Sequence, residues 1–120
     1  MVTIVLADDH TVMRSGLRML LQSEEDFDVV AEAGTIEAAL REVRGRRPAV
    51  LVLDLNMPGG SSIAAIPRVR MISPQTAVVV LTMEIDPWSR REAMSAGAVG
   101  YVLKEAAGSE LVRAIRAAAA

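Results

Sequence analysis

The feature that most constrains the fold is a set of five apolar runs that alternate with segments of helical period. The runs cover residues 2–7, 28–33, 49–53, 77–81 and 99–103. Between them, apolar residues recur every three or four positions, as they do along an amphipathic helix. This alternation predicts five β/α units and a parallel sheet with helices on both faces.

The polarity of the runs predicts the order of the strands. The second run, 28–33, alternates with polar residues more than the third and fourth runs do. A central strand of a parallel sheet is buried on both faces, so we place the second run at an edge and those two at the centre. Right-handed crossovers then favour a doubly wound α/β sheet with five parallel strands in the order 2-1-3-4-5.

A Rossmann dinucleotide fold is the nearest rival architecture. In that fold a glycine-rich turn after the first strand cradles a pyrophosphate. Here Asp8, Asp9 and His10 follow the first run, and the two acids would repel a pyrophosphate.

The sequence also indicates where two later helices begin or end. Gly97 is a stop signal for a helix over 87–96, and Ser109 is the candidate N-cap of a helix over 108–120.

The composition fits one domain, residues 1–120, with an aliphatic core. Hydrophobic residues make up 52% of the chain and aromatic residues only 2%, so Val, Leu, Ile, Ala and Met must fill the core.

A formal net charge of −2 gives no electrostatic footprint for nucleic acid, and we expect no direct contact with it. The chain has no cysteine, no leader and no apolar run near the roughly 20 residues of a membrane helix, so we expect a cytoplasmic protein without membrane contact.

Polar side chains follow four of the five runs, where the strands are expected to end. Asp8 and Asp9 follow the first run, Asp54 the third, Thr82 the fourth and Lys104 the fifth. The carboxyl ends of parallel strands meet at one edge of a sheet, so these side chains should converge. Carboxylates that converge repel one another, and a hard divalent cation with oxygen ligands normally stabilises them. The sequence therefore predicts a Mg²⁺ site.

The lysine and the threonine would complete a phosphate site. Lys104 supplies a positive charge, and Thr82 supplies a neutral donor for phosphoryl oxygens. A carboxylate can accept a phosphoryl group, forming an acyl phosphate, when a metal ion and a lysine offset the charge of the approaching group. Asp54 follows a central strand and is the best placed acceptor.

Each of these residues also has a simpler interpretation. Asp9 alone is explained equally well as the N-cap of a helix beginning near Thr11. Asp54 alone fits a turn before a Pro- and Gly-rich loop, and Thr82 and Lys104, taken singly, are more often surface residues. Their occurrence together at adjacent strand ends favours the site, because an unpaired Asp at the end of a buried strand is costly.

With these residues in place, the whole chain resembles the receiver domain of two-component response regulators, a flavodoxin-like fold. The resemblance is carried by the acidic pair Asp8-Asp9, the acceptor Asp54 followed by Met57-Pro58-Gly59, the switch hydroxyl Thr82, the switch aromatic Tyr101 and the lysine Lys104. It implies that Asp9 and Asp54 bind Mg²⁺ directly, with Mn²⁺ able to substitute. It also implies that Asp8 acts mainly through water and that the main-chain carbonyl of Asn56 is a third protein ligand.

Finer features resemble the NarL/FixJ (LuxR-type) subgroup. They are Ala7-Asp8-Asp9-His10, Arg14-Ser15-Gly16-Leu17 and the run from Ala96 to Lys104. Regulators of that subgroup carry a C-terminal helix-turn-helix DNA-binding domain after the receiver, and nothing like it follows here. The alanine-rich end suggests an isolated receiver from a longer regulator, although a natural single-domain protein also fits.

Two departures from the family pattern bear on the site. The usual glycine a few residues after Met-Pro is replaced here by the run Gly59-Gly60-Ser61-Ser62, so the loop after the acceptor is expected to differ in shape. A small residue usually follows the switch hydroxyl, whereas here Met83 follows Thr82, and its bulk is expected to crowd the phosphate entrance. The resemblance also implies that Asn56 and Glu84 tune the lifetime of the phosphoryl group, with Met83 a further modulating residue.

Other residues invite a functional interpretation less strongly. His10 is the only histidine, but a lone imidazole in a strand-to-helix loop is usually a polar loop residue, so we assign it no catalytic role. Arg44, Arg46 and Arg47 fit a solvated helix end better than a nucleic acid site. Trp88, at the start of the fourth helix, fits an interface anchor and a partly buried core residue about equally.

The resemblance implies a two-component signalling function. A sensor histidine kinase would phosphorylate Asp54 in a Mg²⁺-dependent reaction, Thr82 would move toward the phosphoryl group, and Tyr101 would turn inward. The domain would then control its own C-terminal DNA-binding domain, and with it transcription. The implied dimer contacts are the fourth helix, fifth strand and fifth helix, or the first and fifth helices. The only chemistry implied is self-phosphorylation and self-dephosphorylation, so no enzyme is expected.

Two alternatives remain at this point. One is a receiver-like interaction module that acts without phosphorylation, for which Met83 and the altered loop speak. The other is a phosphatase-type enzyme with a transient aspartyl phosphate. That class needs a second aspartate close after the nucleophile as general acid, and Asn56 stands two residues after Asp54.

Overall fold

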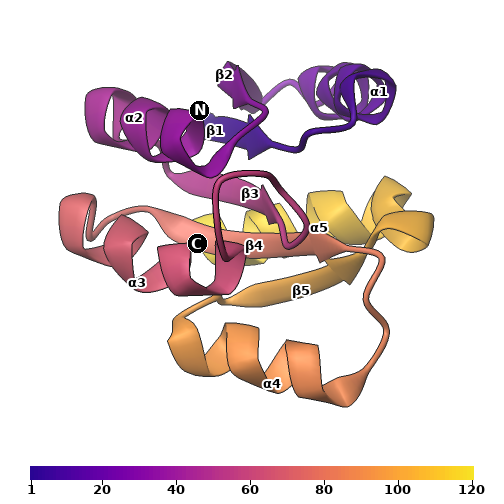
Figure 1. Ribbon diagram of the computed structural model, residues 1–120. Helices are drawn as coiled ribbons and strands as arrows, with labels where there is room; N and C mark the ends of the chain where they lie inside the picture. The colour runs from indigo at the N-terminus through magenta and orange to yellow at the C-terminus, as the bar shows by residue number, and fades with distance from the viewer.

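The computed structural model describes residues 1–120 and contains one sheet of five parallel strands (Figure 1). The strands are β1 (Val2–Ala7), β2 (Phe27–Ala33), β3 (Val50–Asp54), β4 (Ala77–Thr82) and β5 (Gly100–Leu103). The helices are α1 (Thr11–Gln22), α2 (Ile36–Arg46), α3 (Ser62–Ile72), α4 (Pro87–Ala96) and α5 (Ala107–Ala119), with a short 3-10 turn, η1 (Lys104–Ala106), before α5. The order across the sheet is β2-β1-β3-β4-β5, which confirms the predicted doubly wound topology.

The burial of each strand explains its place in the sheet. All five residues of β3 are buried, as a central strand covered on both faces requires. Along β2 buried and partly exposed residues alternate, which confirms its predicted place at an edge. The local limits differ from the prediction by a residue: β2 begins at Phe27, and β3 extends from Val50 to include Asp54.

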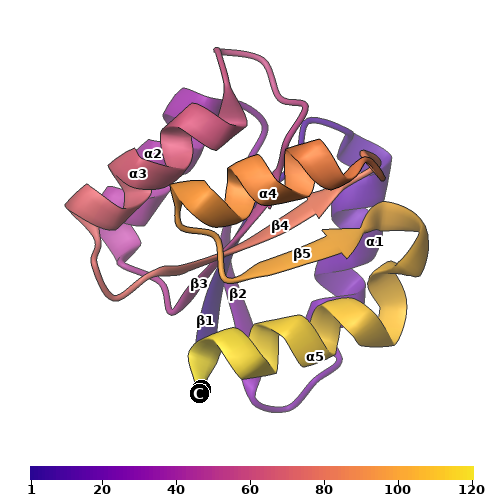
Figure 2. The same ribbon diagram turned by 90° about the horizontal axis from the view of Figure 1, so that it is seen from below.

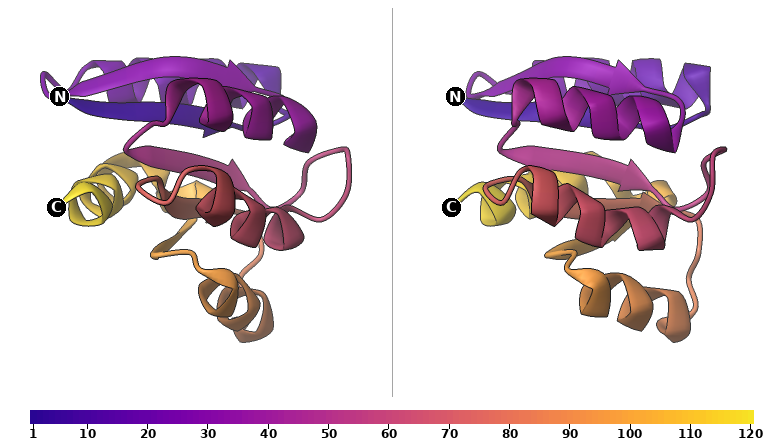
Figure 3. Two further views of the ribbon diagram at one scale, coloured as in Figure 1. Left: turned by 90° about the vertical axis from the view of Figure 1, so that its left-hand side faces the viewer. Right: turned by 60° about the vertical axis from the view of Figure 1, so that its left-hand side comes forward.

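Two layers of helices cover the sheet. Helices α2, α3 and α4 lie on one face, and α1 and α5 lie on the other (Figures 2 and 3). Leu17 and Leu21 of α1 and Leu111 and Ile115 of α5 share one core cluster with β-strand residues, and Ile66 of α3 belongs to the other. No helix combines the length and the hydropathy that a membrane-spanning segment requires.

The predicted N-cap of the last helix is wrong. Helix α5 begins at Ala107, its N-cap is Ala106, and no side chain caps it, so Ser109 lies inside the first turn. The reason is the 3-10 turn that precedes it. The Ala107 N–H donates to the Lys104 carbonyl, and the chain enters the helix through that turn without needing a capping hydroxyl.

Helix α2 ends on a residue in the left-handed region. Arg44 and Arg46 lie in its last turn, as the helix-end interpretation predicts, and Arg47 closes it with φ 45° and ψ 59°. The Arg47 N–H donates to the carbonyl of Val43, and Pro48 follows. Glycine reaches this backbone conformation without the steric cost that a Cβ imposes.

Replacing Arg47 with Gly should therefore stabilise the protein. We expect a gain of about 0.5–1 kcal/mol in the free energy of unfolding, because the left-handed conformation costs an L-residue about 1 kcal/mol. The matched control is Arg46→Gly, one position earlier, where a glycine inside the helix should cost about 1 kcal/mol. Urea denaturation of both variants tests the sign difference, and a loss of stability in Arg47→Gly would contradict it.

Candidate functional site

The register of the parallel strands brings the predicted polar residues to one edge of the sheet. Ala7 pairs with Leu53, so the residues that follow them, Asp8 and Asp54, lie side by side. Across β4 and β5, Thr82 pairs with Leu103, directly before Lys104. The strands point the same way, and the β3–α3 and β4–α4 loops project from this edge (Figure 3).

Lys104 links the two buried carboxylates of this edge. Its Nζ donates to Asp54 Oδ2 at 3.1 Å and lies 3.1 Å from Asp8 Oδ2. Asp8 and Asp54 are each 1% exposed, and Lys104 is 6% exposed. All three are buried, so the interpretation of Lys104 as a surface residue is wrong.

Two carboxylate oxygens of this group are buried and accept no hydrogen bond. They are Asp8 Oδ2, which only the ion pair with Lys104 compensates, and Asp9 Oδ1. Asp9 does not cap α1, because the N-cap is His10 and no side chain bonds to the first turn. The alternative N-cap role for Asp9 is therefore wrong, and its carboxylate faces the same group as Asp8 and Asp54, whose oxygens lie within 4.8 Å of one another.

His10 lies in the same group, although a loop residue with no catalytic role was expected at this position. Its Nδ1 is 3.2 Å from Asp8 Oδ1, 3.3 Å from Asp9 Oδ1 and 3.3 Å from Lys104 Nζ. The main-chain N–H of His10 also donates to Asp8 Oδ1 at 2.8 Å. Its position directly after the acidic pair places the residue near two carboxylates, but the sequence does not give the direction of its ring.

Asp54 belongs to the acidic group and also forms the turn that its sequence context suggested. Its Oδ1 accepts a hydrogen bond from the Asn56 N–H at 3.1 Å, which forms a turn after β3. The loop then passes through Gly59 and Gly60, with φ of 100° and 119°, where glycine is required. The Pro58 carbonyl accepts from Ile36 N, so the loop is tied to the start of α2.

Electrostatics acts differently on the two partners of the buried pair. Burial raises the pKa of Asp54 above its ordinary 3.8, with a further rise from Asp8, against the hydrogen bonds from Asn56 and Lys104. Burial alone would lower the pKa of Lys104, but the hydrogen bond to Asp54 and the ion pair with Asp8 raise it above its ordinary 10.5. The lysine gains from two carboxylates, whereas Asp54 shares its only cation with Asp8. The surroundings therefore favour the charged form of Lys104 and disfavour the charged form of Asp54.

The two predicted switch residues bind the main chain of the same residue, Glu84, through its N–H and its carbonyl. Thr82 is fully buried, and its Oγ1 accepts a hydrogen bond from the Glu84 N–H at 3.1 Å. The Tyr101 hydroxyl donates to the Glu84 carbonyl at 2.8 Å. Thr82 therefore makes no hydrogen bond to Asp54 or Lys104, and the main chain of Glu84 connects it to Tyr101.

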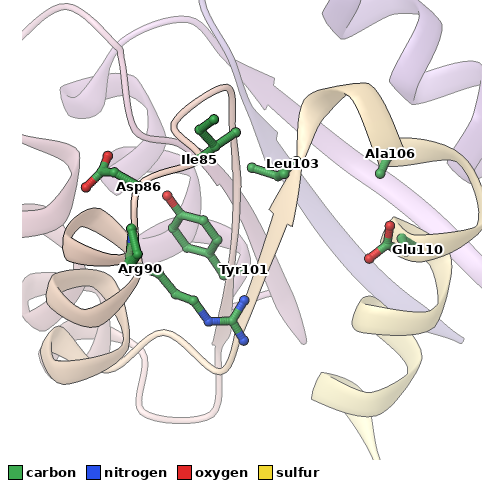
Figure 4. A pocket seen from close by; sticks show the side chains of 8 residues that line it. Ile85, Asp86, Arg90, Tyr101, Leu103, Ala106 and Glu110 are labelled. Carbon is green, nitrogen blue, oxygen red and sulfur yellow. The ribbon is translucent and has the colours of Figure 1, made fainter.

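Tyr101 is a half-buried residue of the edge strand β5, and its ring lies beside α4. Its ring borders a pocket of about 290 Å³, and its hydroxyl points toward the loop that carries Ile85 and Asp86 (Figure 4). Arg90 of α4 lies 5.7 Å from the centre of the ring. Met83 is 71% exposed and lines a separate pocket together with Lys104.

Other parts of the sequence prediction meet mixed outcomes. Trp88 is 65% exposed, with Arg91 5.8 Å from its ring, so it is not a core residue. Arg14, noted only as a subgroup feature, supports the acidic loop: its Nη1 donates to the Asp8 carbonyl at 2.6 Å and its Nε to Glu32 at 2.9 Å. Sequence spacing gives no sign of this contact, because it joins α1 to β2 across the end of β1.

Comparison with known proteins gives a consistent result. The family described as response regulator receiver domain matches residues 4–116. The chain is 40% identical over 114 residues to the oxygen regulatory protein NreC of Staphylococcus epidermidis, covering 94% of this chain and 52% of NreC. It is 39% identical over 116 residues to the DNA-binding transcriptional activator DevR/DosR of Mycobacterium tuberculosis, covering 97% of this chain and 54% of that protein. The chain thus spans about half the length of these curated relatives.

A solved structure shows the same likeness. The LuxR-family two-component response regulator from Aurantimonas sp. SI85-9A1 superposes with a TM-score of 0.91 at 36% identity, covering 97% of this chain and 83% of that one. The resemblance that the motifs indicated is confirmed at the level of the family and its fold. The chain belongs to the response regulator receiver domain family, in its NarL/LuxR-type subgroup, whose members are signalling proteins and not classical enzymes.

Proposed function

We propose that this domain accepts a phosphoryl group on Asp54 and passes the change to its surface. The observation that supports this is the charge balance of the edge. Three carboxylates, Asp8, Asp9 and Asp54, share one lysine, Lys104, and two of their buried oxygens accept no hydrogen bond. Such a group is suited to a divalent cation and to a phosphoryl group whose charge the cation and the lysine offset together.

The donor set fits Mg²⁺, a hard cation that prefers oxygen ligands. Asp9 and Asp54 would bind it directly, Asp8 mainly through water, and the main-chain carbonyl of Asn56 would be a third protein ligand; Mn²⁺ could replace it. When bound, the cation supplies positive charge that draws a phosphoryl oxygen and the acceptor carboxylate together. Lys104 is already held 3.1 Å from Asp54 and supplies the second positive charge.

The transfer itself is a displacement at phosphorus. An oxygen of the Asp54 carboxylate attacks, a new O–P bond forms, and the P–N bond of the donor phosphohistidine breaks, with its electron pair left on the imidazole nitrogen of the donor. Lys104 stabilises the charge on the phosphoryl oxygens during this step. Asn56 holds the other oxygen of Asp54 through its N–H, so the carboxylate keeps a fixed orientation.

The shared contact with Glu84 offers a route from the site to the surface. If Thr82 turns toward the new phosphoryl oxygens, its Oγ1 leaves the Glu84 N–H, and Glu84, whose carbonyl binds the Tyr101 hydroxyl, loses one of its two main-chain contacts. Tyr101 is then free to turn inward, which changes the surface formed by α4, β5 and α5. Asn56 donates to Asp54, Glu84 lies between Thr82 and Tyr101, and Met83 lies between Thr82 and Glu84 in the chain. These three residues are the candidates for tuning the lifetime of the phosphoryl group.

The partners follow from the relatives. A sensor histidine kinase would be the phosphodonor, and the output would be a C-terminal helix-turn-helix domain in the full-length protein, which controls transcription. The description of DevR/DosR as a DNA-binding transcriptional activator, together with coverage of about half of that protein, supports this. A homodimer through α4, β5 and α5, or through α1 and α5, would bring two output domains together.

A phosphorylation-independent module is the second candidate, and it is less well supported. The two features that speak for it, Met83 and the altered loop, leave Asp8, Asp54 and Lys104 in contact at the edge. A phosphatase-type enzyme lacks its general acid, because Asn56 stands where the second aspartate is needed.

Replacing Asp54 with Ala should abolish acid-labile phosphorylation. After incubation with acetyl phosphate and Mg²⁺, intact mass should show one added phosphoryl group on the wild type and none on Asp54→Ala. The control is Asp28→Ala, which removes a carboxylate at the opposite end of the sheet, beside Thr3, and should leave uptake unchanged. Full uptake by Asp54→Ala would refute the assignment.

Replacing Asp54 with Asn should stabilise the metal-free protein at neutral pH. The raised pKa means that ionising Asp54 costs folding stability; the cost is absent below its unfolded pKa near 3.8 and complete above the raised value. We expect a gain on the order of 1 kcal/mol, or roughly 4 °C in Tm, in EDTA, shrinking as the pH falls toward 3.8. Asp26→Asn is the control of opposite sign, because Arg116 holds the pKa of Asp26 below its usual range. A lower Tm for Asp54→Asn at neutral pH would contradict the argument.

Mg²⁺ should raise the melting temperature through the acidic group. At about tenfold above its dissociation constant, a ligand that binds only the folded state adds about 1.4 kcal/mol to the free energy of unfolding. Asp9→Ala should lose most of this shift, and Asp28→Ala should keep it, with NaCl added to match ionic strength. An equal shift in the two variants would point to general screening of charge instead of a site.

A further inference from the structure

His10 points its imidazole into the acidic group. The Nδ1 atom lies 3.2 Å from Asp8 Oδ1, 3.3 Å from Asp9 Oδ1 and 3.9 Å from Asp54 Oδ2. The main chain fixes this position, because the His10 N–H donates to Asp8 Oδ1 and its carbonyl accepts from Arg14 N in the first turn of α1. The ring therefore belongs to the same cluster as the three carboxylates.

These separations are close to those between ligands of one octahedral ion. With bonds of about 2.1 Å, adjacent ligands are about 3.0 Å apart and opposite ligands about 4.2 Å apart. The distance from Nδ1 to Asp9 is near the first value, and that to Asp54 is near the second. Asp9 also carries a buried oxygen, Oδ1, that accepts no hydrogen bond, and this is the oxygen 3.3 Å from Nδ1.

We infer that His10 is an additional ligand of the metal site, and that it shifts the site toward first-row transition cations such as Mn²⁺, Co²⁺ and Zn²⁺. This rests on the proposed metal role of Asp9 and Asp54. Mg²⁺ prefers oxygen ligands and gains little from an imidazole, whereas transition cations bind imidazole nitrogen well. The ring is 59% exposed, so it can adjust to a cation without repacking the core.

A competing interpretation is that the ring only pairs with Asp8 and Asp9 as a partly exposed ion pair. In that case removing it would change the affinity for all divalent cations by the same factor, because only the net charge near the site would change. Coordination would instead change the affinity for one class of cation and spare the other. The two interpretations therefore differ in selectivity and not merely in affinity.

Calorimetric titration of the untagged protein with Mg²⁺ and with Co²⁺, at about pH 8, separates them. His10→Ala should weaken Co²⁺ binding at least tenfold and change Mg²⁺ binding by less than about twofold. Equal changes for both ions, or no change for Co²⁺, would overturn the inference while leaving the proposed function intact. Failure of the wild type to bind either ion would instead overturn the metal role itself, and with it the inference.

A second measurement can be made on the wild-type protein, with the variant only as a control. His10 is the only histidine of the chain, so a histidine nitrogen coupled to bound Mn²⁺ can come from no other residue. Pulsed electron paramagnetic resonance of the Mn²⁺-loaded wild type should show this coupling, and His10→Ala should lack it. A Mn²⁺-loaded wild type without nitrogen coupling would overturn the inference.

Discussion

The contact between Lys104 and the two buried carboxylates, Asp8 and Asp54, is the interaction on which the rest of the site depends. It places a single ammonium 3.1 Å from each of them at the end of three strands. The charges of the group do not balance, because Asp9 adds a third carboxylate beside the single lysine. A fold that buries this imbalance loses stability, as the raised pKa of Asp54 indicates. A bound cation would recover this loss, and the same imbalance supports the proposal that the edge binds a cation and a phosphoryl group together.

The edge is also the point from which a local change can spread. Two short turns, from Asp54 to Asn56 and from Thr82 to Glu84, hold the loops after the two central strands. The second turn ends at Glu84, whose carbonyl accepts from the Tyr101 hydroxyl, so Thr82 and Tyr101 bind the two peptide groups on either side of one residue. A single residue thus separates the two contacts, which is a shorter connection than a chain of packed side chains would give.

Much of this architecture could be predicted from the sequence, for a physical reason. Burial on both faces makes the inner strands continuously apolar, and parallel strands bring their carboxyl ends together, so both the topology and the convergence of Asp8, Asp54 and Lys104 follow from the pattern. The start of α5 and the place of His10 could not be predicted. The first depends on a 3-10 turn that makes a cap unnecessary, and the second on the direction of one ring in a loop.

The measurement that tests the account most directly is the identification of the phosphorylated atom in the wild-type protein. Borohydride reduces an acyl phosphate at an aspartate to homoserine, which tandem mass spectrometry then locates in a peptide. The account predicts homoserine at position 54 alone, in a yield that follows phosphoryl uptake and depends on Mg²⁺. Homoserine at position 8 or 9, or a phosphate that resists reduction and remains on His10, would contradict the claim that the buried partner of Lys104 is the acceptor.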